Sequence, residues 1–132
     1  MTQSIDIPSF SQFVKWMESG ESITAPDGSC PVGTALGIFR GRWKADVIYR
    51  ICAGVSGFGE LQRQIPGVTR AMLSSALKEL ECDGIIHRRE FMDGNVKRTE
   101  YTLTEAGNDL YPVFYALMVW GWKHAHPKGK DA

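Results

Sequence analysis

The chain has 132 residues, a length that fits one domain with a hydrophobic core. Hydrophobic residues make up 43% and charged residues 23%, which is ordinary for a globular protein and argues against global disorder. The formal net charge is zero, so the total charge gives no sign of a nucleic-acid partner.

The cysteines and the apolar segments bear on where the protein works. No apolar run is long enough to cross a bilayer, and the N-terminus lacks the basic and apolar regions of a secretory signal. Cys30, Cys52 and Cys82 are an odd number at wide spacing, with neither a disulfide framework nor a CxxC zinc pattern. We therefore expect a reduced, cytoplasmic setting with no membrane partner, no metal site and no cofactor.

The first predicted helix follows Pro8-Ser9 and ends near Gly20. Ser9 and Gln12 have the spacing of a capping box. An apolar stripe at helical spacing is formed by Phe10, Phe13, Val14 and Met17. The aromatic side chains of this helix require a partner surface, and residues 20–29 are predicted to be a linker.

Three more helices are predicted in the middle of the chain. Cys30-Pro31 begins the first, which runs to about Phe39, because proline fits the first helical turn. The second follows Arg40-Gly41-Arg42, and its core-facing residues are Trp43, Val47, Ile48, Ile51 and Cys52. The third is short, and its apolar stripe is Phe58, Leu61 and Ile65.

The helix over residues 69–84 is the centre of the prediction. Thr69 can cap its start and Gly84 can close its end. Its apolar stripe consists of Met72, Leu73, Ala76, Leu77 and Leu80. Its outer face carries Ala71, Ser74, Ser75 and Lys78, with Arg70 beside them. Such a compact face fits a DNA major groove, although for one isolated helix a solvated surface is the better explanation.

A β-hairpin is predicted directly after this helix. Residues 85–91 and 97–103 are two extended runs around Asp93-Gly94-Asn95, which is a turn signal. Thr99, Tyr101 and Leu103 alternate onto one face of the second strand. Positive charge on the two arms comes from Arg88, Arg89, Lys97 and Arg98. A reading helix followed by a basic ribbon predicts a winged helix-turn-helix.

The last predicted helix is capped by Thr104 and runs to about His124, with Pro112 expected to bend or divide it. One apolar stripe is formed by Leu110, Val113, Phe114 and Leu117. A second is formed by Tyr111, Tyr115, Met118 and Trp122. One stripe can pack on the domain, and the other indicates a second chain.

The predicted architecture is therefore mainly α with a small β-hairpin. Residues 1–29 form an N-terminal helical arm and linker, 30–125 the winged-helix domain with its C-terminal dimerisation helix, and 126–132 a flexible tail. Charge follows this division: residues 1–29 hold one basic and four acidic side chains, whereas residues 40–98 hold eleven basic and seven acidic ones. The basic excess lies where DNA contact is expected.

Several segments in order resemble the HxlR-type winged-helix transcriptional regulators, relatives of the MarR group. The matching segments are Cys30-Pro31-Val32, Gly41-Arg42-Trp43, Phe58-Gly59-Glu60-Leu61, Met72-Leu73, Leu77-Lys78-Glu79-Leu80-Glu81, Asp83-Gly84, Glu100-Tyr101-Thr102-Leu103-Thr104-Glu105-Ala106-Gly107 and Trp120-Gly121. The chain departs from the pattern at Arg40, where the family usually has a glycine. The resemblance implies a homodimer, built from N- and C-terminal helices, that binds a palindromic DNA operator. It also implies a sensor thiol at Cys30, because several members of the family respond to electrophiles or oxidants through a cysteine in this position.

Three sets of site residues follow. We expect DNA contact from Thr69, Arg70, Ser74, Ser75, Lys78, Arg88, Arg89, Lys97 and Arg98. Arg70 is the expected base reader, because arginine binds guanine in bidentate fashion, and the hairpin cations are expected on the DNA backbone or in the minor groove. The expected dimer interface is Phe10, Phe13, Trp16, Tyr111, Tyr115, Met118 and Trp122. Cys30 is the expected redox or effector site, since a helix N-terminus favours the thiolate; a structural cysteine packed at the helix start is the alternative.

No motif indicates catalysis, since the chain has no Ser-His-Asp order, Gly-rich phosphate loop, HExxH or paired carboxylates with a site around them. We therefore predict a sequence-specific DNA-binding regulator that acts as a homodimer. Its partners would be double-stranded DNA and a second copy of itself, with thiol modification or a small aromatic or electrophilic effector tuning its activity. The alternative is a winged-helix module for protein–protein interaction that does not bind DNA specifically.

Overall fold

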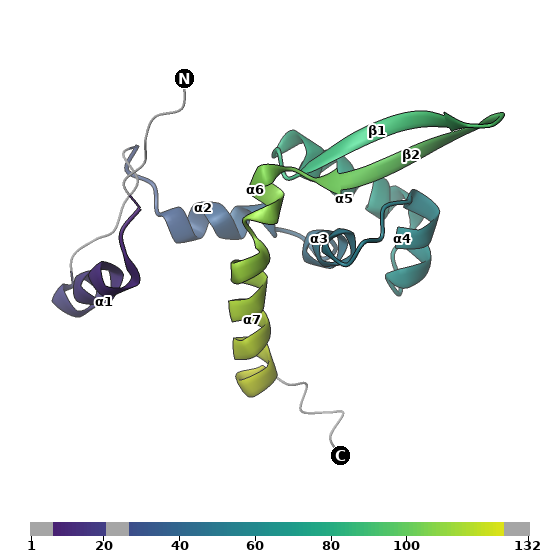
Figure 1. The fold of residues 1–132 in the computed structure, drawn as a ribbon. Coiled ribbons are helices and arrows are strands. Elements are labelled where there is room, and N and C mark those ends of the chain that lie inside the picture. Colours follow the sequence, from purple (N-terminus) through teal and green to yellow (C-terminus); the bar gives the residue numbers. More distant parts are fainter. Residues whose placement is uncertain (1–6, 21–26, 126–132) are drawn as a thin grey trace, which may run out of the picture. The chain divides into compact units, whose positions relative to one another are not determined.

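The computed structural model describes residues 7–20 and 27–125 (Figure 1). The chain divides into two compact units, Met1–Gly37 and Ile38–Ala132, and each is described by itself. Much of the predicted linker and all of the predicted tail, including His126, lie outside the described residues. No helix in the described part of the chain is long and apolar enough to span a membrane.

The first unit contains α1 (Phe10–Ser19) and most of α2 (Pro31–Ile38). The Ser9 hydroxyl caps α1 by accepting a hydrogen bond from the backbone N–H of Gln12 at 3.1 Å, and Gly20 ends the helix with a φ of 76°. Both ends of this helix agree with the prediction. Neither α1 nor α2 contains a fully buried residue, and large apolar side chains such as Phe10, Met17 and Leu36 are exposed.

The second unit follows the predicted order. It contains α3 (Lys44–Cys52), α4 (Phe58–Gln64), α5 (Arg70–Cys82), β1 (Ile86–Asp93), β2 (Val96–Leu103), α6 (Glu105–Asn108) and α7 (Tyr111–His124). Its core lies between α3, α4, α5 and the base of the hairpin. The largest fully buried side chains are Val47, Ile48, Leu61, Ile65, Leu73, Leu80 and Ile86. Of the predicted stripe of α5, Leu73, Ala76, Leu77 and Leu80 are buried. Met72 is not, because it lies on the flank of the helix and is 46% exposed.

The two strands pair in antiparallel register from Ile86 opposite Leu103 to Asp93 opposite Val96. This register leaves Gly94-Asn95 as a two-residue turn, and Gly94 supplies the positive φ of 64° that such a turn requires. The base of the hairpin is attached to the segment before α4, because Tyr101 donates its backbone N–H to the carbonyl of Ser56 at 2.9 Å. The far end projects beyond the helices (Figure 1).

A junction of three segments fixes where α6 meets the hairpin. The Thr104 hydroxyl donates to the carbonyl of Gly84 at 2.6 Å and accepts from the backbone N–H of Gly107 at 3.1 Å. Gly107 is buried there, and a Cβ at this position would lie 2.3 Å from the carbonyl oxygen of Ile85. The junction therefore has no room for a side chain.

The predicted long C-terminal helix is divided in two. α6 ends at Asn108 and α7 begins at Tyr111, so Pro112 lies in the first turn of a new helix, where its missing N–H costs little. The hydroxyl of Tyr111 donates to the carbonyl of Cys52 at 3.0 Å, and the ring of Phe114 meets that of Phe39 edge-on at 5.5 Å. These contacts hold the first turn of α7 against the domain.

Candidate nucleic-acid interface

One side of α5 is buried in the core, and its opposite side is exposed. Thr69 caps the helix by accepting a hydrogen bond from the backbone N–H of Met72 at 3.1 Å. Beyond this cap, Arg70, Ser75 and Lys78 are exposed and Ser74 is half-buried. The guanidinium carbon of Arg70 lies 5.3 Å from the centre of the Phe58 ring, which supports it from α4. Four of the predicted contact residues thus lie on one accessible helix.

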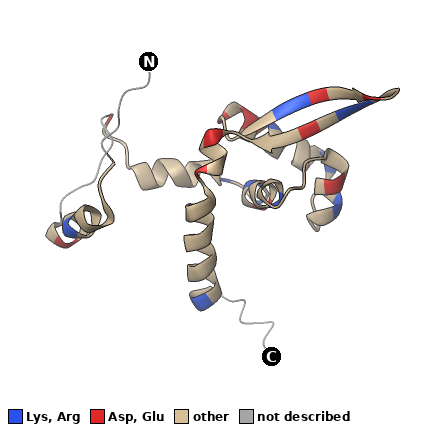
Figure 2. Ribbon diagram, viewed as in Figure 1, with Lys and Arg blue, Asp and Glu red and all other residues tan. Residues whose placement is uncertain are grey.

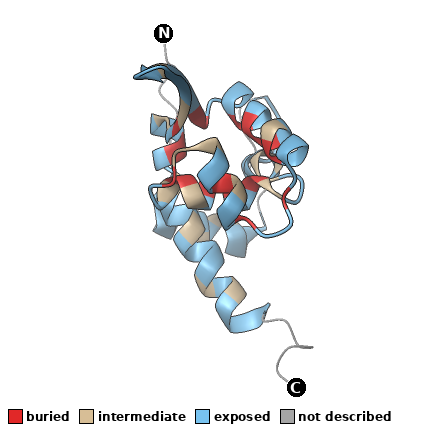
Figure 3. Ribbon diagram, turned by 90° about the vertical axis from the view of Figure 1, so that its right-hand side faces the viewer, coloured by how far each residue is buried: buried red, intermediate tan, exposed pale blue. Residues whose placement is uncertain are grey.

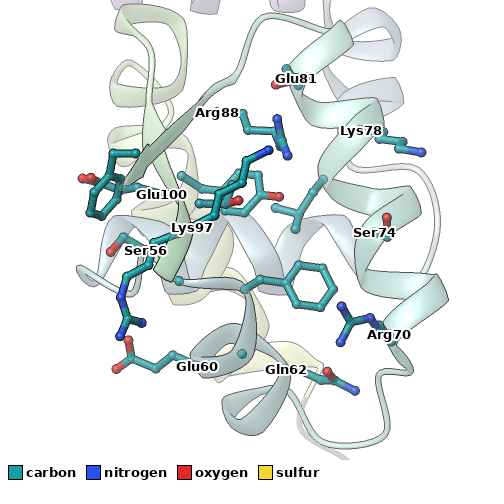
Figure 4. Close-up of a pocket in the computed structure, with 18 of the residues that line it drawn as sticks. Ser56, Glu60, Gln62, Arg70, Ser74, Lys78, Glu81, Arg88, Lys97 and Glu100 are labelled. Carbon is teal, nitrogen blue, oxygen red and sulfur yellow. The ribbon is translucent and has the colours of Figure 1, made fainter. Parts of the chain in front are cut away.

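A groove of about 960 Å³ separates α5 and α4 from the hairpin (Figure 4). Six basic side chains line it, which are Arg63, Arg70, Lys78, Arg88, Lys97 and Arg98. Three acidic side chains line it, which are Glu60, Glu81 and Glu100. Arg88 and Lys97 extend from the hairpin toward α5, whereas Lys78 points away from the hairpin (Figure 4). Basic side chains thus outnumber acidic ones in the groove, which favours binding of the anionic backbone of a nucleic acid.

The four hairpin cations occupy both faces of the ribbon rather than one patch. Strand alternation and the pairing of Arg88 with Tyr101 and of Met92 with Lys97 place Arg88 and Lys97 on the face that also buries Tyr101. Arg89, paired with Glu100, and Arg98, paired with Phe91, belong to the opposite face. The pairing register therefore separates the four cations into an inner pair and an outer pair, and Arg98 of the outer pair also lines the groove.

Every one of these hairpin cations has an acidic partner on the hairpin itself. Glu90 contacts both inner cations, with its carboxylate 3.0 Å from Lys97 and hydrogen-bonded to Arg88. The contact with Lys97 has the larger effect on the pKa of Glu90, and both contacts lower it. On the outer face, Arg89 lies 2.6 Å from Glu100 and Arg98 lies 2.7 Å from Asp93. Figure 2 shows the resulting mixture of positive and negative residues along the ribbon.

The cations of α5 differ from those of the hairpin. Arg70 and Lys78 make no ion pair within residues 7–20 and 27–125, although both are exposed. Arg63 of α4 likewise lines the groove without an ion pair in that part of the chain, and it was not among the predicted contacts. Arg63 could not be predicted as a contact, because the short apolar stripe of α4 does not show that the polar face of this helix lies beside the hairpin.

The three cysteines have different surroundings. Cys30 is exposed and directly precedes α2, whose first backbone hydrogen bond runs from the Thr34 N–H to the Cys30 carbonyl at 3.0 Å. Cys52 is half-buried at the end of α3, and burial raises the pKa of its thiol. Cys82 is exposed at the end of α5. Cys52 thus packs against the core, as predicted, and its raised thiol pKa disfavours the reactive thiolate.

The residues expected at a dimer interface are mostly exposed. On α7, Tyr111 is 50% exposed, Tyr115 67%, Met118 51% and Trp122 75%, and Figure 3 shows the exposed far part of this helix. Trp120, which is outside the predicted interface set, is 61% exposed. Val113 and Leu117 of the other stripe are 39% and 49% exposed. On α1, Phe10 and Phe13 are exposed and Trp16 is half-buried. Only Leu110 and Phe114 of the predicted inward stripe pack on the core.

Comparisons with known proteins give consistent results. A family model described as HxlR-like helix-turn-helix matches residues 38–129. The chain is 41% identical over 95 residues to the uncharacterized HTH-type transcriptional regulator YdeP of Bacillus subtilis (strain 168), covering 72% of this chain and 73% of that protein. It is 35% identical over 118 residues to an uncharacterized HTH-type transcriptional regulator of Methanothermobacter thermautotrophicus, covering 89% and 86% of the two chains.

Solved structures extend the similarity to three dimensions. The redox regulator HypR in its reduced form matches with a TM-score of 0.67 and 35% identity, over 74% of this chain and 95% of that chain. The reduced form of the transcriptional regulator YodB from B. subtilis matches with a TM-score of 0.65 and 31% identity, over 74% and 96%. These similarities confirm the predicted winged helix-turn-helix, mainly α with one β-hairpin.

Proposed function

The chain belongs to the HxlR-like helix-turn-helix family of transcriptional regulators, and from this premise we propose that it binds a palindromic operator as a homodimer, with α5 reading bases and the hairpin contacting phosphates. The family is one of regulators and not of enzymes. The observation that carries the finer proposal is the contrast between α5 and the hairpin, because α5 offers exposed cations that no carboxylate of the described chain neutralises.

Arg70 is proposed as the principal base reader. It is exposed at the first position of α5, where the N-terminal residues of a recognition helix meet base edges. Its contact with the Phe58 ring limits the directions that the guanidinium can take, which reduces the entropy lost on binding. Thr69, Ser74, Ser75 and Lys78 share the accessible side of the helix and are proposed to contact phosphates or bases beside it.

The hairpin is proposed to contact the DNA backbone through Arg88 and Lys97 on its inner face, with Arg89 and Arg98 available to a backbone or minor groove on the outer side. All four are ion-paired in the free protein, so phosphate must exchange with a carboxylate partner on binding. Because phosphates carry no sequence information, the hairpin is proposed as a sequence-independent contact.

The homodimer is supported by the unpartnered apolar surface of α7. Large side chains such as Tyr115 and Trp122 are more than half exposed along a helix of 14 residues. Apolar surface of this extent on one helix favours association. A second copy related by a two-fold axis would present two α5 helices to one duplex, which is why we propose a palindromic operator with half-sites about one helical turn apart.

Binding to DNA is tested by selecting bound duplexes from a random pool and measuring their affinity by fluorescence anisotropy at several salt concentrations. We expect Arg70→Ala to weaken the selected duplex by about 1–3 kcal/mol and to relax preference at one base position. We expect Lys97→Gln to weaken selected and unrelated duplexes alike and to lower the salt slope by about one unit. Lys123→Gln, which removes an exposed cation from the last turn of α7, is the matched control.

Two results would contradict the proposal. Retention of a salt slope equal to that of the wild type in Lys97→Gln would show that the hairpin does not touch phosphate. Salt-labile binding with no selected sequence at all would favour instead a module for protein–protein interaction, whose hairpin is an internally neutralised edge. Sedimentation tests the dimer separately: Trp122→Glu is expected to yield a monomer, and an unchanged dimer would place the interface elsewhere.

Control by thiol chemistry is the remaining part of the proposal. HypR, which this chain resembles in structure, is a redox regulator. In this chain Cys30 is exposed directly before α2, where a reagent can reach its thiol, and so it is the proposed target of an oxidant or an electrophilic effector. Thiol-reactivity rates measured for each cysteine test this assignment. Cys30 should react fastest, and a rate no faster than that of free cysteine would rule it out as a sensor.

A further inference from the structure

The loop between α2 and α3 lies beside α5, on the flank away from the hairpin groove. A second cavity of about 360 Å³ is lined by residues of this loop, among them Arg40, Arg42 and Trp43, and by residues of α5, among them Met72, Ser75 and Glu79. No residue that lines this cavity also lines the hairpin groove. The loop and the hairpin therefore flank the same helix from different sides.

Helical geometry shows that these two flanks bracket the outward side of α5. Successive residues are rotated by about 100° around an α-helix. Arg70, Ser74 and Glu81 consequently lie along the hairpin flank, which agrees with their place in the groove. Met72 and Glu79 lie along the loop flank. The exposed residues Ala71 and Lys78 fall between the two flanks, on the side of the helix farthest from the core.

The structure holds Arg42 ready to bind an anion. Its guanidinium carbon lies 4.5 Å from the centre of the Trp43 ring, and Arg42 is exposed. The ring of Trp43 is itself packed against the core and reaches to within 3.5 Å of where a Cβ on Gly67 would lie. A guanidinium held over a packed ring loses little entropy on binding, and its N–H donors can still reach an anion.

The cations beside this cavity differ in whether a carboxylate already binds them. Lys44 is buried, and its amine is committed to Glu79 at 2.7 Å and Asp83 at 3.9 Å, so it holds α3 against α5. Arg42, by contrast, makes no ion pair with any residue in the described ranges 7–20 and 27–125, and the same is true of exposed Arg40. The loop thus carries two uncommitted positive charges beside the helix proposed to read DNA.

A helix inserted in the major groove has a phosphate backbone on each side, because that groove is about 12 Å wide and is bounded by both strands. The hairpin flank can meet one backbone only. We propose that Arg42, assisted by Arg40, is a phosphate-binding site on the other flank of α5, so that each protomer contacts both strands that border the groove. This inference rests on the proposed function and adds to it a contact that is not on the reading helix or the hairpin.

The test compares Arg42→Gln and Arg42→Lys with the wild type in the anisotropy assay over a range of salt concentrations. Arg42→Gln should lower the magnitude of the salt slope by about one unit and weaken selected and unrelated duplexes by the same factor. Arg42→Lys should keep the slope, because it keeps the charge. Lys123→Gln, an exposed cation on α7, should change neither quantity. Urea unfolding of each variant shows whether removal of the stacked guanidinium has altered the fold.

The outcomes separate this inference from the proposed function. If the wild type selects a sequence and Arg42→Gln, folded as stably as the wild type, keeps the full salt slope, the second phosphate site is overturned while the operator proposal stands. If Arg42→Gln is destabilised, Arg40→Gln gives the same comparison without disturbing the stack, and its unchanged slope would likewise overturn the assisted site. If the wild type selects no sequence, the proposed function fails and this inference fails with it.

Discussion

Replacing Gly107 with alanine tests the junction that joins α5, the hairpin and α6. The new Cβ would lie 2.3 Å from the carbonyl oxygen of Ile85 and 3.0 Å from the Leu103 side chain. Carbon and oxygen atoms in close contact are usually about 3.3 Å apart or more, so the backbone must move by roughly 1 Å. The same carbonyl accepts hydrogen bonds from the backbone N–H of Thr104 at 3.0 Å and from its hydroxyl at 3.1 Å, and that movement would weaken both.

The magnitude follows from opposing effects. Forcing a methyl group into a packed site costs about 1–3 kcal/mol, and each weakened hydrogen bond adds up to about 1 kcal/mol. Alanine recovers at most about 1 kcal/mol over glycine within a helix, and less in the short α6. The expected net loss is about 2 kcal/mol of unfolding free energy, which corresponds to a shift of roughly 1 M in the urea midpoint.

The assay is urea unfolding followed by circular dichroism at one fixed protein concentration, because association would make stability depend on concentration. Gly59→Ala in α4 is the matched control, since its Cβ would meet only the end of the Arg63 side chain at an ordinary 3.5 Å. Gly59→Ala should unfold at or above the midpoint of the wild type. The reasoning would be refuted if Gly107→Ala unfolded at the same urea concentration as the wild type and the control.

Further predictions concern Glu90 and Lys44. Glu90→Gln frees Arg88 and Lys97 from their carboxylate and should tighten DNA binding and steepen its salt dependence in anisotropy; weaker binding would mean that the inner face does not meet phosphate. In the free protein the lowered pKa of Glu90 means that its ion pairs stabilise the fold at pH values above its ordinary pKa and are lost as the pH falls through the lowered one. The small difference in melting temperature between Glu90→Gln and the wild type should therefore be present at neutral pH and vanish in strong acid, and a difference that persists there would contradict this cause. Glu79→Gln leaves the buried Lys44 amine with only Asp83 at 3.9 Å and should cost about 1–2 kcal/mol of unfolding free energy in urea. Lys44→Met leaves only exposed carboxylates behind and should cost less than about 1 kcal/mol. If Lys44→Met were the more destabilising variant, burial of the amine would not be the cause.

The order and type of the elements could be predicted from local patterns. The Thr69 cap, the glycine turn at Gly94 and the strand alternation around Tyr101 depend on residues close together in the chain, and each was found where the pattern placed it. The division of the last helix was less well predicted, because Pro112 marks a first turn as readily as a bend. Periodicity alone could not decide between those two outcomes.

The surroundings of the charged residues could not be predicted, because they depend on contacts between distant segments. Counting charges made the hairpin appear an uncommitted basic arm, yet its register gives every one of those cations a carboxylate partner on the ribbon. Met72 fitted an apolar stripe, but the width of the contact between α5 and the core leaves it 46% exposed. Arg42 looked like part of a helix break until packing brought its loop beside α5.

The joint at the start of α7 has a mechanical consequence. Contacts with the domain are concentrated in its first turn, where Tyr111 bonds to the end of α3 and Phe114 meets Phe39, while the residues beyond are mostly exposed. A helix of 14 residues is about 21 Å long, so a tilt of about 10° at this pivot displaces its tip by roughly 4 Å. In a dimer joined through α7, such a tilt would change the distance between the two α5 helices by several ångströms. That change is enough for the two helices no longer to match the spacing of successive major grooves.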